Sequence, residues 1–316
     1  MKKIWIAWEI QRRSTNLAKE FNARLFQFNY NGVFRYPVVI TRTLLTLMKE
    51  RPKILFVQNP STMLAFMTCI LKPLFGYNLI VDRHTLFKNI LKNKLISFFD
   101  DYSLDHANLT IVTNNDLKEE LLGKNKKRKI GVLADKVPEI NEQEKKRLRG
   151  RYNAVFICTW AADEPYNEII KAAKFLPSDI FVYITGKPKI KKNLGIPNFV
   201  FTGFLSREEY DGLLQSADVI LDFTEEENCL VCGAYEALAV EKPLITSDTK
   251  ALREYFNEGV IYTKHKPESI ANAITIAIKN RKELSDKIKK LRQKRNKEWI
   301  EKFNKIEREI LGKCAE

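Results

Sequence analysis

Short apolar runs of strand length recur along the first half of the chain, and longer segments that suit helices separate them. The runs are rich in β-branched and aromatic residues. They are Ile4–Trp8, Ile54–Val57, Leu79–Val81, Leu109–Val112 and Ile130–Leu133. This alternation is typical of βαβ units, so it predicts a doubly wound parallel sheet.

The alternation begins again after residue 150. The predicted strands are Ala154–Cys158, Ile180–Ile184, Phe199–Thr202, Val219–Leu221, Leu244–Thr246 and Val260–Tyr262. The segment before them, Ala134–Arg151, is polar and contains Pro138 and a basic run at residues 145–147. We therefore expect an α/β protein with two Rossmann-like domains, residues 1–150 and 151–296, facing each other across a cleft.

The end of the chain reads as helix throughout. From Pro267 to Leu311, isoleucine, leucine and phenylalanine recur at helical spacing, and no run of strand type interrupts them. We expect the last of these helices, about residues 297–316, to join the first domain.

The basic residues are unevenly distributed. Residues 1–150 contain 27 Lys and Arg against 14 Asp and Glu, a net charge of +13, whereas residues 151–316 contain 27 against 25, a net charge of +2. A hydrophobic content of 45% excludes a disordered chain. The first domain is therefore expected to meet an anionic partner, either a polyanion or an anionic bilayer.

The sequence also bears on location. Met1-Lys2-Lys3 leads into a short apolar run closed by Glu9, which is not a secretory signal. The longest apolar stretch, Met63–Leu71, falls short of the roughly 20 residues that span a bilayer. The five cysteines show no disulfide framework. We expect a cytoplasmic chain, peripheral on the inner face of the plasma membrane if it touches one.

The most informative segment is Asp222–Ser247, because ligands of parallel sheets bind outside the carboxyl ends of the strands. A strand leads into an acidic loop and then into a predicted helix, Asn228–Val240. If that helix begins near Cys229, its free N–H groups suit a diphosphate. Those groups belong to Leu230, Val231 and Gly233, and Glu236 follows within two turns, placed to accept hydrogen bonds from ribose hydroxyls.

The same segment carries a resemblance to a known family. Gly233–Ser247, followed by Leu252–Glu254, is similar to the donor-binding segment of GT-B glycosyltransferases of family 4. The resemblance extends to Phe201–Ser206 with the helix after it, and to Ile184–Lys187, so that it covers residues 153–282. It implies a GT-B fold and a nucleotide-sugar donor such as a UDP- or GDP-sugar.

The resemblance also implies roles for single residues. Glu236 becomes the ribose ligand, Phe204 and Leu205 border the base, and Gly186 and Lys187 lie by the base or phosphates. The first Glu of the family pattern falls on Asn228, which leaves a donor-sugar contact and a plain helix N-cap both open.

Two further positions match or replace family features in the first domain. His84 stands where the family keeps a His beside the donor sugar, and a buried structural His is the alternative. Trp8–Ser14 replaces a Gly-rich turn. Arg12, Arg13 and a helix beginning near Ser14 are expected to supply positive charge to the phosphates; an ordinary solvated helix start is the alternative. The family's Lys-Gly after the first strand of the second domain is also replaced, here by Thr159–Pro165.

These features predict a hexosyl- or related glycosyltransferase that acts with retention, with His84 and Glu236 as its candidate catalytic residues. In a front-face displacement the departing phosphate takes the acceptor proton. We expect a glycan or lipid-linked acceptor, no cofactor, and no metal, because no Asp-x-Asp motif occurs.

Other readings stay open. The chain is alternatively a degenerate GT-B protein that binds without transferring, a nucleotide-sugar epimerase, or a basic nucleic-acid-binding protein, which is the least favoured. The run Lys124–Lys129 reads as a solvated loop, and Cys229 with Cys232 as a structural pair. Leu86–Leu104 resembles a basic amphipathic helix that either lies on a membrane or packs on the first sheet.

Overall fold

The computed structural model describes residues 1–30, 32, 34–59, 61–84, 93–143, 146–190 and 195–312. The chain divides into two units. Unit 1 comprises Met1–Asp135 with Trp299–Glu316, and unit 2 comprises Lys136–Glu298. Each unit is built on one six-stranded sheet whose strands all run parallel.

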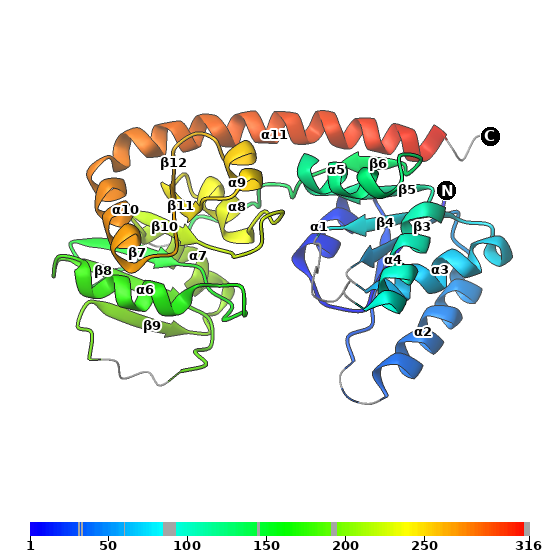
Figure 1. Ribbon diagram of the computed structural model, residues 1–316, viewed down its shortest axis with the longest axis horizontal. Coiled ribbons are helices and arrows are strands. Elements are labelled where there is room, and N and C mark those ends of the chain that lie inside the picture. Colours follow the sequence, from blue (N-terminus) through cyan, green and yellow to red (C-terminus); the bar gives the residue numbers. More distant parts are fainter. Residues whose placement is uncertain are drawn as a thin grey trace. The chain divides into compact units, whose positions relative to one another are not determined.

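The sheet of unit 1 has the order β2-β1-β3-β4-β5-β6. Figure 1 labels four of its strands, β3 to β6. Its strands are β1 Lys3–Ala7, β2 Arg24–Gln27, β3 Ile54–Asn59, β4 Asn78–Arg83, β5 Leu109–Val112 and β6 Ile130–Val132. The edge strand β2 was not predicted, because its Arg-Leu-Phe-Gln sequence is half polar and short. The other five coincide with the apolar runs, since both faces of this sheet are covered.

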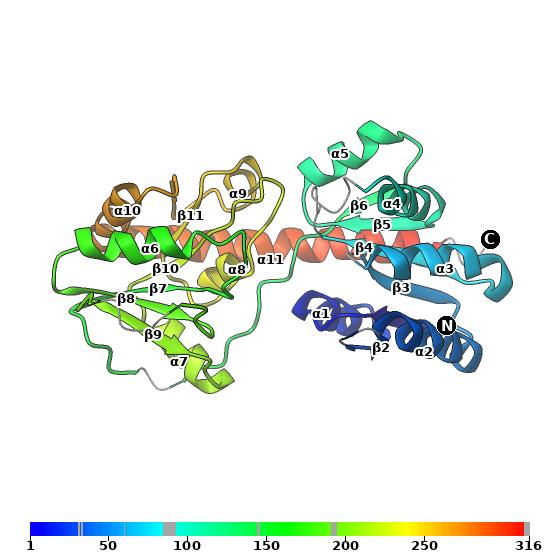
Figure 2. The same ribbon diagram turned by 60° about the horizontal axis from the view of Figure 1, so that its bottom comes forward.

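Alternate residues of these strands enter two cores. On one face, α1 (Arg12–Glu20) and the end of α11 (Arg281–Gly312) cover Trp5, Phe56 and Ile111. On the other face lie α2 (Arg35–Glu50), α3 (Thr62–Phe75), α4 (Lys94–His106) and α5 (Asn115–Lys124). Figure 2 shows these helices around the sheet of unit 1.

The sheet of unit 2 has the order β12-β11-β10-β7-β8-β9, which is the doubly wound order of dinucleotide-binding domains. Its strands are β7 Tyr152–Phe156, β8 Ile180–Thr185, β9 Phe199–Gly203, β10 Val219–Asp222, β11 Leu244–Ser247 and β12 Val260–Thr263. All six were predicted. The strand order reverses between β7 and β10.

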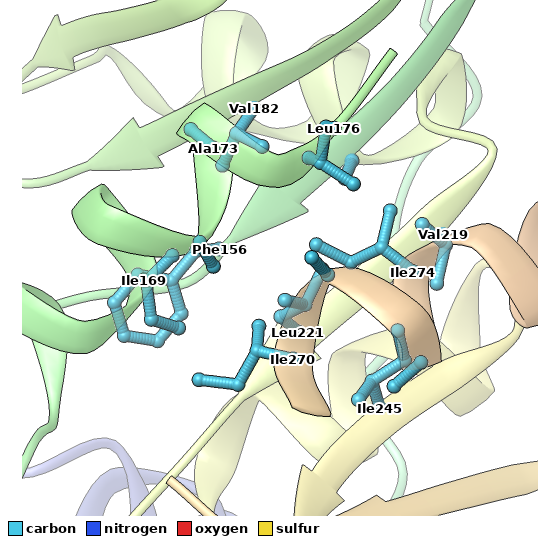
Figure 3. Packing of buried hydrophobic residues seen from close by; sticks show 14 of the residues in the cluster. Phe156, Ile169, Ala173, Leu176, Val182, Val219, Leu221, Ile245, Ile270 and Ile274 are labelled. Carbon is cyan, nitrogen blue, oxygen red and sulfur yellow. The ribbon is translucent and has the colours of Figure 1, made fainter. Parts of the chain in front are cut away.

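The main core of unit 2 lies between this sheet and two helices, α6 (Tyr166–Ala172) and α10 (Pro267–Lys279). Figure 3 shows Phe156, Leu221 and Ile245 of the strands packed against Ile169 of α6 and Ile270 of α10. The other helices that lie within this unit are η2 Ala173–Phe175, α7 Arg207–Ser216, α8 Cys232–Ala239 and α9 Lys250–Tyr255. The prediction of two doubly wound parallel sheets with helices at the carboxyl end is confirmed.

The division between the units falls at Asp135 and not at residue 150. Backbone N–H groups of the polar connecting segment explain why it belongs to unit 2. Gln143 donates to the side chain of Gln215, and Arg149 donates to the hydroxyl of Tyr183. The last helix, α11, contributes its final turns to unit 1 from Trp299 onward.

Candidate functional site

The carboxyl edge of the unit 2 sheet brings two loops together at its reversal point. One loop follows β7 and the other follows β10. The hydroxyl of Thr224 donates to the carboxylate of Asp163 at 2.8 Å, and the N–H of Glu225 donates to the carbonyl oxygen of Asp163 at 2.8 Å. Ligands of doubly wound sheets bind at such a reversal, so the candidate site is built from these loops and α8.

Glu236 lies on α8 and is buried, with 3% of its surface exposed. Its Oε2 accepts a short hydrogen bond from the hydroxyl of Tyr210, which comes from α7. Tyr210 therefore fixes one carboxylate oxygen of Glu236 through a neutral donor. The sequence analysis did not single out Tyr210.

A second buried carboxyl group, that of Asp222, lies at the end of β10. The N–H of Gly233 donates to its Oδ2 at 2.6 Å. A Cβ on residue 233 would clash with the same carboxyl group, so only glycine fits there. Burial raises the pKa of Asp222 well above its usual value, and the neighbouring charges of Glu164 and Glu236 raise it further.

The start of α8 corrects one prediction. The helix begins at Cys232 with Val231 at the N-cap, and not near Cys229. Asn228 lies in a preceding turn, so of the two roles left open for it the helix N-cap is wrong, and the donor-sugar contact stays a prediction. The reason is that Leu230 and Val231 bury their side chains, and Val231 has extended backbone angles. Two of the three predicted N–H donors, Leu230 and Val231, thus precede the helix.

The loop after β7 holds a carboxylate in the position of the family's Lys-Gly. Glu164 accepts hydrogen bonds from the N–H of Thr159 at 3.0 Å, from its hydroxyl at 2.8 Å and from the N–H of Ala161 at 2.9 Å. Between them, Trp160 adopts a left-handed backbone with φ 63°, and its buried indole donates to the carbonyl oxygen of Thr185. These N–H groups, which suit a phosphate, therefore hold an internal anion.

Four predicted residues gather at the ends of β8 and β9. Gly186 has φ 79°, and a Cβ there would clash with the carbonyl oxygen of Cys158. Gly186 also pairs with Gly203 in an isolated bridge. Lys187 is exposed, as is Phe204, whose side chain is 90% exposed, and Leu205 is half-buried.

Arg13 in unit 1 has partners within its own unit. Its guanidinium donates to Asp82 at 2.8 Å, to Asp135, and to the carbonyl oxygen of Leu133 at 3.0 Å. Burial alone would lower the pKa of Arg13, but the charges of Asp82 and Asp135 outweigh burial and raise it. Arg13 is thus a buried ion-pair partner, and its predicted contact with donor phosphates stays a prediction.

The neighbours of Arg13 differ in exposure. Arg12, the first residue of α1, is exposed, whereas Ser14 is fully buried and its hydroxyl has no hydrogen-bond partner among the described residues. His84 follows β4 and places its Nδ1 3.7 Å from Asp82 Oδ2. Asp82 therefore brings Arg13 and His84 together. The catalytic role of His84 stays a prediction.

One further histidine lies at the carboxyl edge of unit 2. His265 follows β12, and its Nε2 is 2.8 Å from the hydroxyl of Ser247. That hydroxyl donates to the carbonyl oxygen of Thr224, which ties β11 to the loop after β10. Burial lowers the pKa of His265, although Glu225 counteracts this. The sequence analysis had assigned His265 no function.

Three predictions remain, which concern a metal site, the basic run and the amphipathic helix. Within the described ranges, no group of three or more His, Cys, Asp or Glu is arranged to hold a metal ion. Lys124 and Arg128 pair with Asp101 of α4, so part of the basic run is structural. Residues 86–92 of the predicted amphipathic helix and Lys145 of the predicted boundary lie outside the described residues, whereas Leu104 packs on the sheet.

Comparisons with known proteins agree with this architecture. Residues 140–295 match the sequence model of the family described as Glycosyl transferases group 1. A search of the curated proteins by sequence finds no match.

Solved structures resemble the whole chain. Anabaena HepE, in complex with UDP and glucose, has a TM-score of 0.72 at 11% identity, over 95% of this chain and 91% of that chain. Sucrose-phosphate synthase from Thermosynechococcus elongatus has a TM-score of 0.75 at 12% identity, over 97% of both chains. S. aureus MnaA with UDP has 0.62 at 13%, over 91% of both. These likenesses establish the fold and confirm the GT-B prediction; family 4 in particular stays a prediction.

Proposed function

We propose that this chain, which carries a group 1 glycosyl transferase domain over residues 140–295 and has the GT-B fold, transfers a sugar from a nucleotide-sugar to a glycan or lipid-linked acceptor. The observation that carries the proposal is buried Glu236 at the reversal point of the unit 2 sheet. A buried carboxylate there suits two ribose hydroxyls, since each oxygen accepts several hydrogen bonds.

The proposed donor is a UDP-sugar. Support comes from the similar Anabaena HepE, which was solved with UDP-glucose as well as with UDP, and from MnaA with UDP. Tyr210 donates to Oε2 of Glu236, and the ribose hydroxyls donate to the same carboxylate. Phe204 and Leu205 border the base, and Gly186 and Lys187 lie by the base or phosphates. Asn228 meets the sugar.

The proposed chemistry is transfer with retention by a hexosyl- or related transferase. The acceptor oxygen bonds to the anomeric carbon on the face that the phosphate leaves, and a phosphate oxygen takes the acceptor proton. The protein then has to position the substrates and stabilise the charge on the leaving group. His84 would contact the donor sugar, and Arg12 and Lys187 are exposed cations suited to phosphate oxygens.

Two observations favour a second candidate function, a binding protein that does not transfer. Glu164 already occupies the N–H groups after β7, and Asn228 replaces the family's first Glu. A diphosphate would meet carboxylate charge at this loop. An epimerase is the further alternative, and it would need no acceptor.

A transfer assay separates these functions. The chain is incubated with UDP-sugars and a lipid extract, and both released UDP and glycosylated product are measured. We expect product with retained configuration, and no product from Glu236→Ala. Glu208→Gln, which changes an exposed carboxylate on α7, is the matched control and should keep activity. Binding without product supports the second function, and full activity of Glu236→Ala refutes the assigned site.

A further inference from the structure

The side of α3 that faces away from the core of unit 1 is apolar, whereas this side of a surface helix is ordinarily polar. Met63, Ile70 and Leu74 are exposed by 37%, 52% and 77%. They lie seven and four residues apart, so they form one stripe along the helix. The opposite side packs on the sheet through Leu64, Ala65 and Cys69.

The helices on either side of α3 extend this surface. All three pack on the same face of the unit 1 sheet, so their outer sides look in one direction (Figure 2). Leu45 and Met48 are exposed on α2, and Leu95 and Phe98 on the first turns of α4. The ring of Phe66 joins α3 to α4, since it lies 6.4 Å from that of Phe98.

The charge around this surface has one sign. Between residues 34 and 75 the sequence has six Lys and Arg and a single acidic residue, Glu50. Glu50 is buried and forms an ion pair with Lys2 at 2.7 Å, so its carboxylate does not add negative charge to the exposed surface. Arg42, Lys49 and Arg51 are exposed. On α4, Asp101 and Asp105 are paired with Arg128.

Unit 2 has no comparable surface among its described residues. Its exposed large apolar side chains are Phe175, Phe204 and Ile276, and each belongs to a different part of the unit. Isolated residues of this kind are ordinary, whereas a contiguous apolar surface marks an interaction site.

We propose that the outer sides of α2, α3 and the first turns of α4 dock unit 1 on an anionic membrane surface. Leucine, isoleucine, methionine and phenylalanine would enter the acyl boundary, and the arginines and lysines would meet anionic headgroups. A second copy fits less well, because the chain carries a formal net charge of +15 and two copies would repel. None of the described helices is long and apolar enough to cross a bilayer, so this contact is interfacial.

Vesicle co-sedimentation of the full chain, without any donor, tests this inference independently of the proposed transferase activity. We expect binding to phosphatidylglycerol–phosphatidylcholine vesicles that weakens with added salt, and much weaker binding to pure phosphatidylcholine. The double variant Ile70→Asp/Leu74→Asp should weaken partitioning by roughly tenfold or more, because two apolar side chains no longer insert.

Two controls keep the test decisive. Phe175→Asp/Ile276→Asp changes two exposed apolar residues of unit 2 and should bind as the unchanged chain does. Leu74→Ser alone, at the most exposed position of the stripe, should give a smaller loss with an unchanged thermal midpoint. Equal binding to neutral and anionic vesicles, unchanged binding of the double variant, or a dimer that dissociates in this variant by light scattering would overturn the proposal.

Discussion

Buried Asp and Glu side chains near the C-terminal ends of the strands have different kinds of partner in the two units. In unit 1, Asp82 pairs with Arg13 at 2.8 Å and Asp100 pairs with Arg83 at 2.5 Å, all four side chains being buried. In unit 2, Asp222 accepts from the N–H of Gly233 and Glu236 accepts from the hydroxyl of Tyr210, and neither of these donors carries a charge.

This difference separates scaffold from candidate site. Each buried ion pair brings opposite charges together and links β4 to a neighbouring helix, α1 through Arg13 and α4 through Asp100. At Asp222, burial and the nearby charges of Glu164 and Glu236 raise the pKa, and a carboxyl group perturbed in this way is typical of a functional site. The contrast predicts that loss of Arg13 in unit 1 lowers stability, whereas substitutions at Tyr210 and Glu236 in unit 2 change ligand binding.

The largest effect is expected from a variant that removes the Arg13–Asp82 ion pair of unit 1. Arg13→Ala leaves Asp82 buried without its main cation and should lower the free energy of unfolding by about 3–5 kcal/mol, measured by urea titration. Its neighbour provides the control. Arg12→Ala changes an exposed arginine and should cost about 1 kcal/mol or less. Equal losses in the two variants would remove the structural role assigned to Arg13.

An intermediate loss of stability is expected for Tyr210→Phe. This variant removes the hydrogen bond from Tyr210 to the buried carboxylate of Glu236. A hydrogen bond to a charged group contributes about 1.5–3 kcal/mol to the free energy of unfolding. A double-mutant cycle with Glu236→Gln, followed by UDP titration, measures the coupling of the two side chains. Additive effects on UDP affinity would show that Tyr210 does not position Glu236.

The smallest expected effect concerns Asp222→Asn. The pKa of Asp222 is higher in the folded protein than in the unfolded chain, where it is near 3.8. Protonated Asp222 therefore stabilises the folded wild-type protein fully below pH 3.8, and this contribution is lost as the pH rises through the folded pKa. Asparagine keeps an acceptor for Gly233 but does not ionise. The variant should therefore gain stability relative to wild type as pH rises, on the order of 1 kcal/mol. Parallel pH profiles of thermal stability would contradict this.

Sequence pattern predicted the strands well and local starts less well. Runs such as Val219–Leu221 are apolar because both faces of the sheet are covered, so periodicity alone finds them. The predicted start of α8 was wrong because Leu230 and Val231 bury their side chains, and Val231 has extended backbone angles immediately before the helix. That burial depends on tertiary packing and leaves no local sign.

Some residues of the candidate site could likewise be located from the sequence, and others could not. Gly186, Gly233 and Glu236 could be located because they follow predicted strands and match a motif. Tyr210 could not, since it meets Glu236 across 26 positions of sequence. Glu164 gave a weak signal, an acidic residue just after a strand where a cation was expected, but its N–H partners appear only in the folded loop.

The central claim is that Glu236 binds the ribose of a nucleotide-sugar. The most direct measurement is the thermal midpoint of the purified chain with UDP-, GDP-, ADP- and CMP-sugars, with Glu236→Ala alongside. Ligand at a hundred times its Kd stabilises the folded state by about 2.7 kcal/mol. We predict a raised midpoint with a UDP-sugar that Glu236→Ala loses. No shift with any nucleotide-sugar, or an equal shift in the variant, would contradict the account.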